Sequence, residues 1–150
     1  MDIPTDIIFS HVFVDGTIYH PSFNNEFHNF HFLIDTGSSK TTILQGDARK
    51  LGINFSILPK RRKEIRGIVG GTTPYFLKKV VIGFLSVDLT QQILLPLNEL
   101  NVLKSEEEEE ERYTYSLLGI DMIKRFDFHY NMPKVRLTLK DRYIRLGAII

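Results

Sequence analysis

The feature that most constrains this chain is a succession of short apolar segments separated by turn-forming residues. The segments are rich in Ile, Val, Phe, Tyr and Leu, and Gly, Pro, Asn or Asp interrupts them. This pattern predicts a strand-rich fold, with Asp15-Gly16 as a tight hairpin turn between the first two strands. The expected strands cover residues 7–14, 17–19, 30–34, 41–44, 64–69, 75–87, 91–96, 113–118, 126–130, 135–139 and 143–146.

Two short segments are typical of helices instead. Residues 46–52 offer about two turns and end at a glycine, which is a common helix stop. Residues 121–125 fit a second short helix. With 150 residues, 43% hydrophobic and 25% charged, the chain has the size and composition of one globular domain spanning 1–150. The expected fold class is therefore all-β with one or two short helices.

Two charge runs interrupt the apolar pattern, one basic at residues 60–63 and one of six glutamates at 106–111. A block of like charges repels itself and cannot enter a core, so each run is expected to be a solvated loop. The acidic run indicates a loop insertion at about 104–112, and docking to a basic partner is the alternative. The 19 basic and 18 acidic residues nearly cancel, which argues against a nucleic-acid partner.

The absence of cysteine excludes disulfides, thiolate metal sites and cysteine nucleophiles, and it fits a reducing compartment. The first residues carry an acidic side chain at Asp2 and no long apolar run, so they do not resemble a signal peptide. No segment reaches transmembrane length. We therefore expect a cytoplasmic protein without a membrane partner.

The most informative stretch is the apolar run 30–34, which continues directly into Asp35-Thr36-Gly37-Ser38. Burial penalises the ionised form of a carboxylate, so a site at the end of a buried strand must supply hydrogen bonds or accept a proton. Gly37 lacks a Cβ and lets its N–H approach closely, Ser38 offers a hydroxyl to the carboxylate, and Thr36 can tie the loop down. The alternative is that Asp35 merely caps a turn, since these residue types are common in turns.

Two further segments accompany this motif. Leu117-Leu118-Gly119 is an apolar pair with a glycine, immediately before the second expected helix. Residues 66–75 form a glycine-rich tip between two strand-like arms, centred on Gly70-Gly71.

Together these segments make the chain resemble the retropepsin-like aspartic proteases, the pepsin and retroviral type, and in size their single-lobe members. The resemblance covers most of the chain and implies a closed-barrel-like lobe. It implies that Asp35, Thr36 and Gly37 form the catalytic triplet and that Leu117, Leu118 and Gly119 support it. It also implies that a hairpin flap closes over the substrate, with substrate-binding residues at Ser38, Ser39, Ile68, Val69, Gly70 and Gly71.

The mechanism of these proteases requires two carboxylates, and this sequence contains one Asp-Thr-Gly. The resemblance therefore implies a homodimer in which each subunit supplies Asp35 to cleave a peptide or protein substrate. It implies no cofactor and no metal. The alternative function is a retropepsin-like domain that binds a peptide or protein without cleaving it.

The chain departs from the retroviral pattern at Ile120, where those enzymes usually carry an arginine that braces the dimer. The spacing between the two motifs is also longer, which the acidic insertion explains. A cellular or microbial single-lobe member therefore fits better than a viral enzyme.

Other kinds of site are poorly supported by the sequence. His28 and His31 would point to opposite faces of a strand, so shared metal ligation is not expected. The Gly-x-Ser-x-Gly motif of serine hydrolases is absent, and so is a phosphate-binding glycine loop.

Overall fold

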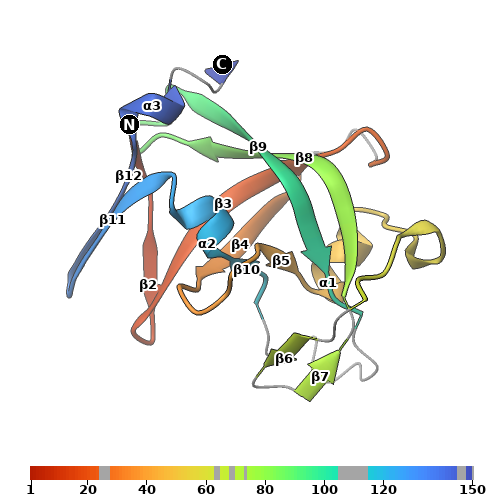
Figure 1. The fold of residues 1–150 in the computed structure, drawn as a ribbon. Coiled ribbons are helices and arrows are strands. Elements are labelled where there is room, and N and C mark those ends of the chain that lie inside the picture. Colours follow the sequence, from red (N-terminus) through yellow and green to blue (C-terminus); the bar gives the residue numbers. More distant parts are fainter. Residues whose placement is uncertain are drawn as a thin grey trace.

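The computed structural model describes residues 1–23, 28–62, 65–67, 70–72, 74–104, 115–144 and 148–149 (Figure 1). The expected strands at 64–69 and 113–118 and the acidic run therefore lie partly or wholly outside the described residues. In chain order the elements are β1 (Asp2–Ile3), β2 (Asp6–Ile8), β3 (His11–Tyr19), β4 (Asn29–Ile34), β5 (Thr42–Ile43), α1 (Gln45–Lys50), the 3-10 turn η1 (Phe55–Ile57), β6 (Ile65–Gly67), β7 (Gly70–Thr72), β8 (Tyr75–Leu85), β9 (Gln92–Val102), β10 (Leu117–Leu118), α2 (Ile120–Ile123), β11 (Phe126–Asn131), β12 (Lys134–Leu139), α3 (Asp141–Ile144) and β13 (Ala148–Ile149).

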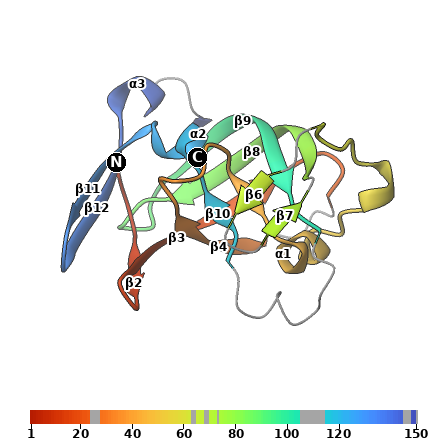
Figure 2. The same ribbon diagram turned by 60° about the horizontal axis from the view of Figure 1, so that its bottom comes forward.

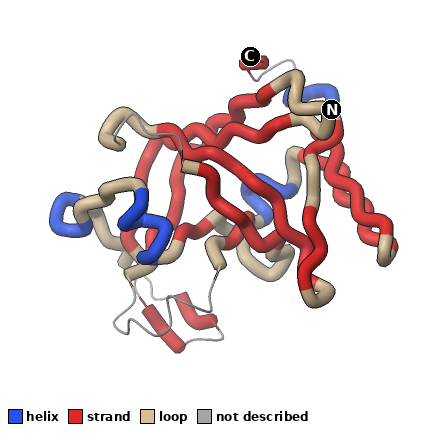
Figure 3. The backbone as a smooth tube through the Cα atoms, turned by 180° about the vertical axis from the view of Figure 1, so that it is seen from behind, coloured by secondary structure: helices blue, strands red, loops and turns tan. Residues whose placement is uncertain are grey.

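Strand pairing closes the main sheet into a barrel. β3 pairs with β4, β4 with β10, β10 with β5, β5 with β9, β9 with β8, and β8 returns to β3. The β4–β10 and β5–β9 pairs are parallel, and the other four are antiparallel. The expectation of an all-β, closed-barrel-like fold is confirmed, and strands, drawn in red, dominate the backbone in Figure 3.

Two hairpins extend from the barrel. β11 and β12 pair antiparallel and, with β1, form a separate three-stranded sheet that projects away from the barrel in Figures 1 and 2. β6 and β7 form a two-stranded hairpin at the end of the barrel that carries α1.

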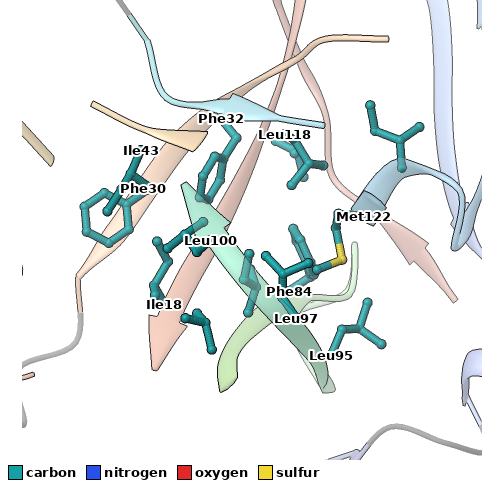
Figure 4. Close-up of a cluster of buried hydrophobic side chains, with 14 of the residues drawn as sticks. Ile18, Phe30, Phe32, Ile43, Phe84, Leu95, Leu97, Leu100, Leu118 and Met122 are labelled. Atoms are coloured by element: carbon teal, nitrogen blue, oxygen red, sulfur yellow. The ribbon is translucent and has the colours of Figure 1, made fainter. Parts of the chain in front are cut away.

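The barrel interior is filled by aromatic and aliphatic side chains, many of them completely buried (Figure 4). Three of these come from short elements that would not be stable alone: Ile43 from β5, Leu118 from β10 and Met122 from α2, each 0% exposed. Burying a side chain of this size contributes roughly 1.5–3 kcal/mol. The core therefore fixes β5, β10 and α2, the elements that surround the Asp35 loop.

The predicted hairpin turn at Asp15-Gly16 is wrong. Both residues lie in the middle of β3, where Asp15 pairs with His31 and Gly16 with Phe30. The turn is instead at Phe9 and Ser10, which have φ values of 49° and 66°. A Cβ on Gly16 would lie 3.2–3.3 Å from core side chains, so this glycine serves close packing.

Two other expectations need correction. Residues 141–144 form α3, whereas a strand was predicted at 143–146; Asp141 lies in the first turn, where the helix dipole favours an acidic side chain. β9 continues past Pro96 to Val102, because β8 pairs with it on both sides of the proline, with Ile82 opposite Leu95 and Val80 opposite Leu97. Helix α1 agrees with the prediction, and Gly52 follows it with a φ of 70°.

Candidate active site

Asp35 follows directly on β4, and β10 lies alongside that strand end. Leu117 pairs with Leu33 and Leu118 with Ile34 in parallel register, and the N–H of Asp35 donates to the carbonyl oxygen of Leu118 at 3.0 Å. β10 also pairs antiparallel with β5 through Leu117 and Thr42, so it lies between the two strands that flank the Asp35 loop. Leu117-Leu118-Gly119 and Asp35-Thr36-Gly37, 80 residues apart in sequence, are therefore neighbours in the structure.

The Asp35 loop holds its carboxylate by a backbone donor. The N–H of Gly37 donates to Asp35 Oδ1 at 2.9 Å, as the sequence predicted for this glycine. The N–H of Ser38 donates to the carbonyl oxygen of Asp35 at 3.2 Å, which closes a tight turn. Thr36 and Gly37 are exposed and Asp35 is partly exposed, so this loop lies at the protein surface.

Two expectations for this loop need correction. The Ser38 hydroxyl donates to the carbonyl oxygen of Lys40 at 2.8 Å and therefore does not serve the carboxylate within the chain. Asp35 is also less buried than its apolar strand suggested, because β4 ends at Ile34 and the following loop turns outward.

Gly119 is required by the close approach of two chain segments. A Cβ at this position would lie 2.4 Å from the carbonyl carbon of Lys40 and 2.7 Å from the Thr41 nitrogen. Both are backbone atoms, so no side-chain movement can relieve the overlap. The glycine therefore lets the segment at 117–121 contact the end of the Asp35 loop directly.

Sequence reasoning missed two residues of this contact, Thr41 and Asp121. Asp121 Oδ1 accepts hydrogen bonds from the N–H of Thr41 at 2.9 Å and from its hydroxyl at 2.7 Å. A Thr and an Asp separated by 80 positions form no motif, and their proximity follows only from the insertion of β10 between β4 and β5.

The predicted flap corresponds in place to the β6–β7 hairpin. Gly67 pairs with Gly70 and Arg66 with Gly71, so Gly70 and Gly71 belong to β7. The predicted tip at Gly70-Gly71 therefore falls within the paired part of the hairpin. Ile68 and Val69, which were predicted to bind substrate, lie outside the described residues.

The base of this hairpin is tied to the barrel. The N–H of Arg61 donates to the carbonyl oxygen of Pro74 at 2.8 Å, and that of Phe76 to Pro59 at 3.1 Å. The Arg61 side chain donates to Glu99 Oε2 at 2.8 Å and to Asn101 Oδ1 at 2.6 Å. Part of the basic run, predicted as a solvated loop, is thus bonded to β9 through the Arg61 side chain.

The positive charge of Arg61 at the base of the hairpin is balanced by the carboxylate of Glu99. The hydrogen bond from Arg61, together with the positive charges of Arg61, Lys40 and Lys78, holds the pKa of Glu99 below its usual value against a smaller opposing effect of burial. Asn101 also donates its N–H to the carbonyl oxygen of Thr41 at 3.1 Å. The base of the hairpin and the end of the Asp35 loop are therefore both hydrogen-bonded to β9.

Among the described residues, one group of side chains could hold a metal ion: Asp6, Asp15 and His31 on the adjacent strands β2, β3 and β4. Their ligand atoms lie within 4.8 Å of one another, and His31 Nδ1 already contacts Asp15 Oδ1 at 2.5 Å. His28 is not in this group, and the expectation that it does not share a metal ion with His31 stays a prediction. A side-chain hydrogen bond accounts for the His31–Asp15 contact.

The fold and the Asp-Thr-Gly loop define the class of retropepsin-like aspartic proteases, and two comparisons agree with that class. The sequence model of the family described as "gag-polyprotein putative aspartyl protease" matches residues 21–125, more than half of the chain. The structure resembles the crystal structure of a retropepsin-like aspartic protease from Rickettsia conorii, with 18% sequence identity and a TM-score of 0.60. That match covers 100% of this chain and 92% of the other.

The chain therefore belongs to the gag-polyprotein aspartyl protease family and has the retropepsin-like fold. No protein with a curated description matches it. No helix among the described residues is both long and apolar enough to cross a membrane.

Proposed function

We propose that this chain is an aspartic endopeptidase whose active unit is a homodimer, with Asp35 as the catalytic carboxylate of each subunit. The observation that carries this proposal is the placement of Asp35 on a surface loop. Its N–H is hydrogen-bonded to the carbonyl oxygen of Leu118, and its carboxylate accepts a hydrogen bond from the Gly37 N–H. The sequence provides one such loop per chain. A two-fold axis through the exposed face of the loop brings Asp35 against Asp35.

The proposed mechanism uses the two carboxylates as one acid and one base. Two carboxylates in contact cannot both be ionised without strong repulsion, so they share one proton. The ionised Asp35 takes a proton from a water molecule whose oxygen attacks the peptide carbonyl carbon. The protonated Asp35 donates its proton to the carbonyl oxygen. Return of a proton to the amide nitrogen then breaks the C–N bond and releases both products.

In this proposal the other residues of the site have distinct roles. The Gly37 N–H stabilises the ionised carboxylate through the hydrogen bond already present in the monomer, and the exposed Thr36 faces the second subunit. Leu117, Leu118 and Gly119 hold the loop from behind. No metal or cofactor takes part.

We further propose that the substrate is an extended peptide that lies between the Asp35 loop and the β6–β7 hairpin. An extended backbone can form strand-like hydrogen bonds with such a hairpin. Ser38, Ser39 and residues 68–71 are the proposed substrate contacts. Ile120 is 40% exposed where retroviral enzymes use an arginine, so the proposed dimer uses an apolar contact there.

The wider setting is also proposed. We infer that residues 1–150 form one domain in the cytoplasm, since the sequence has no cysteine, and that the glutamates at 106–111 form a solvated insertion.

The test is digestion of a peptide library by the purified chain at several pH values, with Asp35→Asn as the matched control. Asparagine keeps the shape of the side chain and removes its acid–base capacity. The proposal expects defined cleavage sites, a bell-shaped pH profile, inhibition by a transition-state mimic of aspartic proteases, and no cleavage by Asp35→Asn. A folded dimer that binds peptides without cleaving them would favour the binding domain instead.

A further inference from the structure

The carboxylate of Asp121 contacts the end of the Asp35 loop from the first turn of α2. Its Oδ1 accepts two hydrogen bonds from one residue, the N–H and the hydroxyl of Thr41, and Thr41 is completely buried. We propose that Asp121 is a positioning residue for Asp35, acting through the Thr41 hydroxyl. This inference rests on the proposed function, because it assigns a role in the same reaction.

The Thr41 hydroxyl links Asp121 to the glycine beside the Asp35 loop. Its oxygen accepts a hydrogen bond from the N–H of Gly119 at 3.1 Å, while its hydrogen is donated to Asp121. Asp121 therefore fixes the rotation of the hydroxyl and turns its lone pair toward Gly119. Hydrogen bonds in such a chain strengthen one another, and the ionised acceptor at its end makes the first bond a strong one.

Together with backbone hydrogen bonds, this relay joins the segment 117–121 to the Asp35 loop along its whole length. We call this set of contacts the clamp. At its start, the N–H of Asp35 is bonded to Leu118 O. In its middle, the carbonyl oxygens of Ser38 and Ser39 accept from the N–H groups at positions 120 and 121, at 2.8 and 3.3 Å. At its end, Thr41 is held by Asp121. Loss of the last contact frees the end of the loop, and a displacement of about 1 Å at a reacting group can slow catalysis about a hundredfold.

Asp121 also has a second, separable role. Burial lowers the pKa of Arg125, one turn further along the chain, and the charges of Tyr143 and Asp121 oppose that shift. Asp121 Oδ2 is buried and has no hydrogen-bond partner among the described residues, so it contributes to this role through charge alone. An asparagine would keep an acceptor oxygen for Thr41 and remove the charge near Arg125. The two roles can therefore be measured apart.

The experiment compares Asp121→Ala, Asp121→Asn and Thr41→Val, with Asp127→Asn as a control on an exposed acid of β11. In folded dimers, Asp121→Ala and Thr41→Val should each lower kcat by roughly ten- to a hundredfold at unchanged KM, because the loop is misplaced while substrate contacts remain. Asp121→Asn should retain most of kcat but melt at a lower temperature. The control should match wild type in kcat and KM.

The double variant Asp121→Ala/Thr41→Val tests whether the two residues act as one unit. Its loss of kcat should be smaller than the product of the two single losses, since either change removes the bond between the Thr41 hydroxyl and Asp121. Losses that multiply would overturn the relay. A folded Asp121→Ala dimer with wild-type kcat, or Asp121→Asn as slow as Asp121→Ala, would overturn the positioning role. If Asp121→Ala does not fold, Thr41→Val and Asp121→Asn decide.

A measurement without substrate keeps this inference separate from the proposed function. Amide hydrogen exchange at Thr41 and Gly119 should be faster in Asp121→Ala than in wild type and unchanged in Asp127→Asn. Equal protection in Asp121→Ala would overturn the inference. If wild type cleaves peptides, Asp35→Asn does not, and Asp121→Ala still cleaves at the wild-type rate, this inference alone is refuted. Absence of cleavage by a wild-type dimer would refute the proposed function.

Discussion

The Asp35 loop and the β6–β7 hairpin are held in contrasting ways. Residues 35–41 are bonded to the segment 117–121 at their start, middle and end, and Gly119 brings the two backbones into direct contact. The pairing described for β6 and β7 is with each other, and the hairpin joins the barrel through backbone bonds at Pro59, Arg61, Pro74 and Phe76.

This contrast matches two different requirements of the proposed reaction. A carboxylate that exchanges protons with water and substrate must be held to a fraction of an ångström, which needs bonds along the whole loop. A segment that admits and covers an extended peptide must be able to move, which needs a firm hinge and few other contacts. Substitutions in the two regions should therefore affect different quantities.

The largest effect is expected at the clamp, for Gly119→Ala. The added Cβ meets the Lys40 backbone at 2.4 Å, so the two segments must separate. We expect a loss of about 2–4 kcal/mol in the free energy of unfolding and loss of cleavage, measured by chemical denaturation and peptide hydrolysis.

Gly46→Ala is the matched control for that change. Gly46 lies in α1 and a Cβ there meets nothing within 4 Å, so the substitution should be neutral or stabilise by roughly 0.5–1 kcal/mol. Equal effects of the two substitutions would mean that the close contact at Gly119 is not what holds the loop.

A smaller effect, confined to activity, is expected in the hairpin for Gly70→Val. Gly70 lies in β7 opposite Gly67. A bulky side chain there should lower kcat/KM by roughly tenfold while the melting temperature and dimer mass stay unchanged, because β6 and β7 form a two-stranded sheet separate from the barrel sheet. Unchanged cleavage by a folded Gly70→Val variant would mean that a segment other than the β6–β7 hairpin covers the substrate.

The smallest effect is expected at the base of the β6–β7 hairpin, for Glu99→Gln. Arg61 holds the pKa of Glu99 below its usual value in the folded protein, so the ionised pair stabilises the fold above the unfolded-state pKa and the contribution is lost as pH falls through the folded-state pKa. Wild type should exceed Glu99→Gln in stability by about 0.5–1 kcal/mol at neutral pH, and the two should converge in acid. A difference that grows with acidity would contradict this assignment.

The sequence could predict the parts of the site that are local patterns, but not the contacts between residues far apart in the chain. Asp35 and Leu117–Gly119 are readable because each is a local pattern, an apolar strand end with turn chemistry or an apolar pair with glycine. Thr41 and Asp121 are not readable, since their contact depends on β10 entering between β4 and β5. The misplaced turn at Asp15-Gly16 has another cause: a glycine needed for packing against Phe32 and the β8 side chains looks the same in sequence as one needed for a turn.

The measurement that tests the central claim most directly is the activity of mixed dimers of wild type and Asp35→Asn. Random pairing at equal amounts gives roughly one quarter wild-type dimers, one half mixed dimers and one quarter double-mutant dimers. If the site consists of one Asp35 from each subunit, mixed dimers are inactive and roughly a quarter of the wild-type activity remains. If mixed dimers keep half of the wild-type rate, so that half of the total activity remains, each subunit has a complete site and the shared Asp35 pair is refuted.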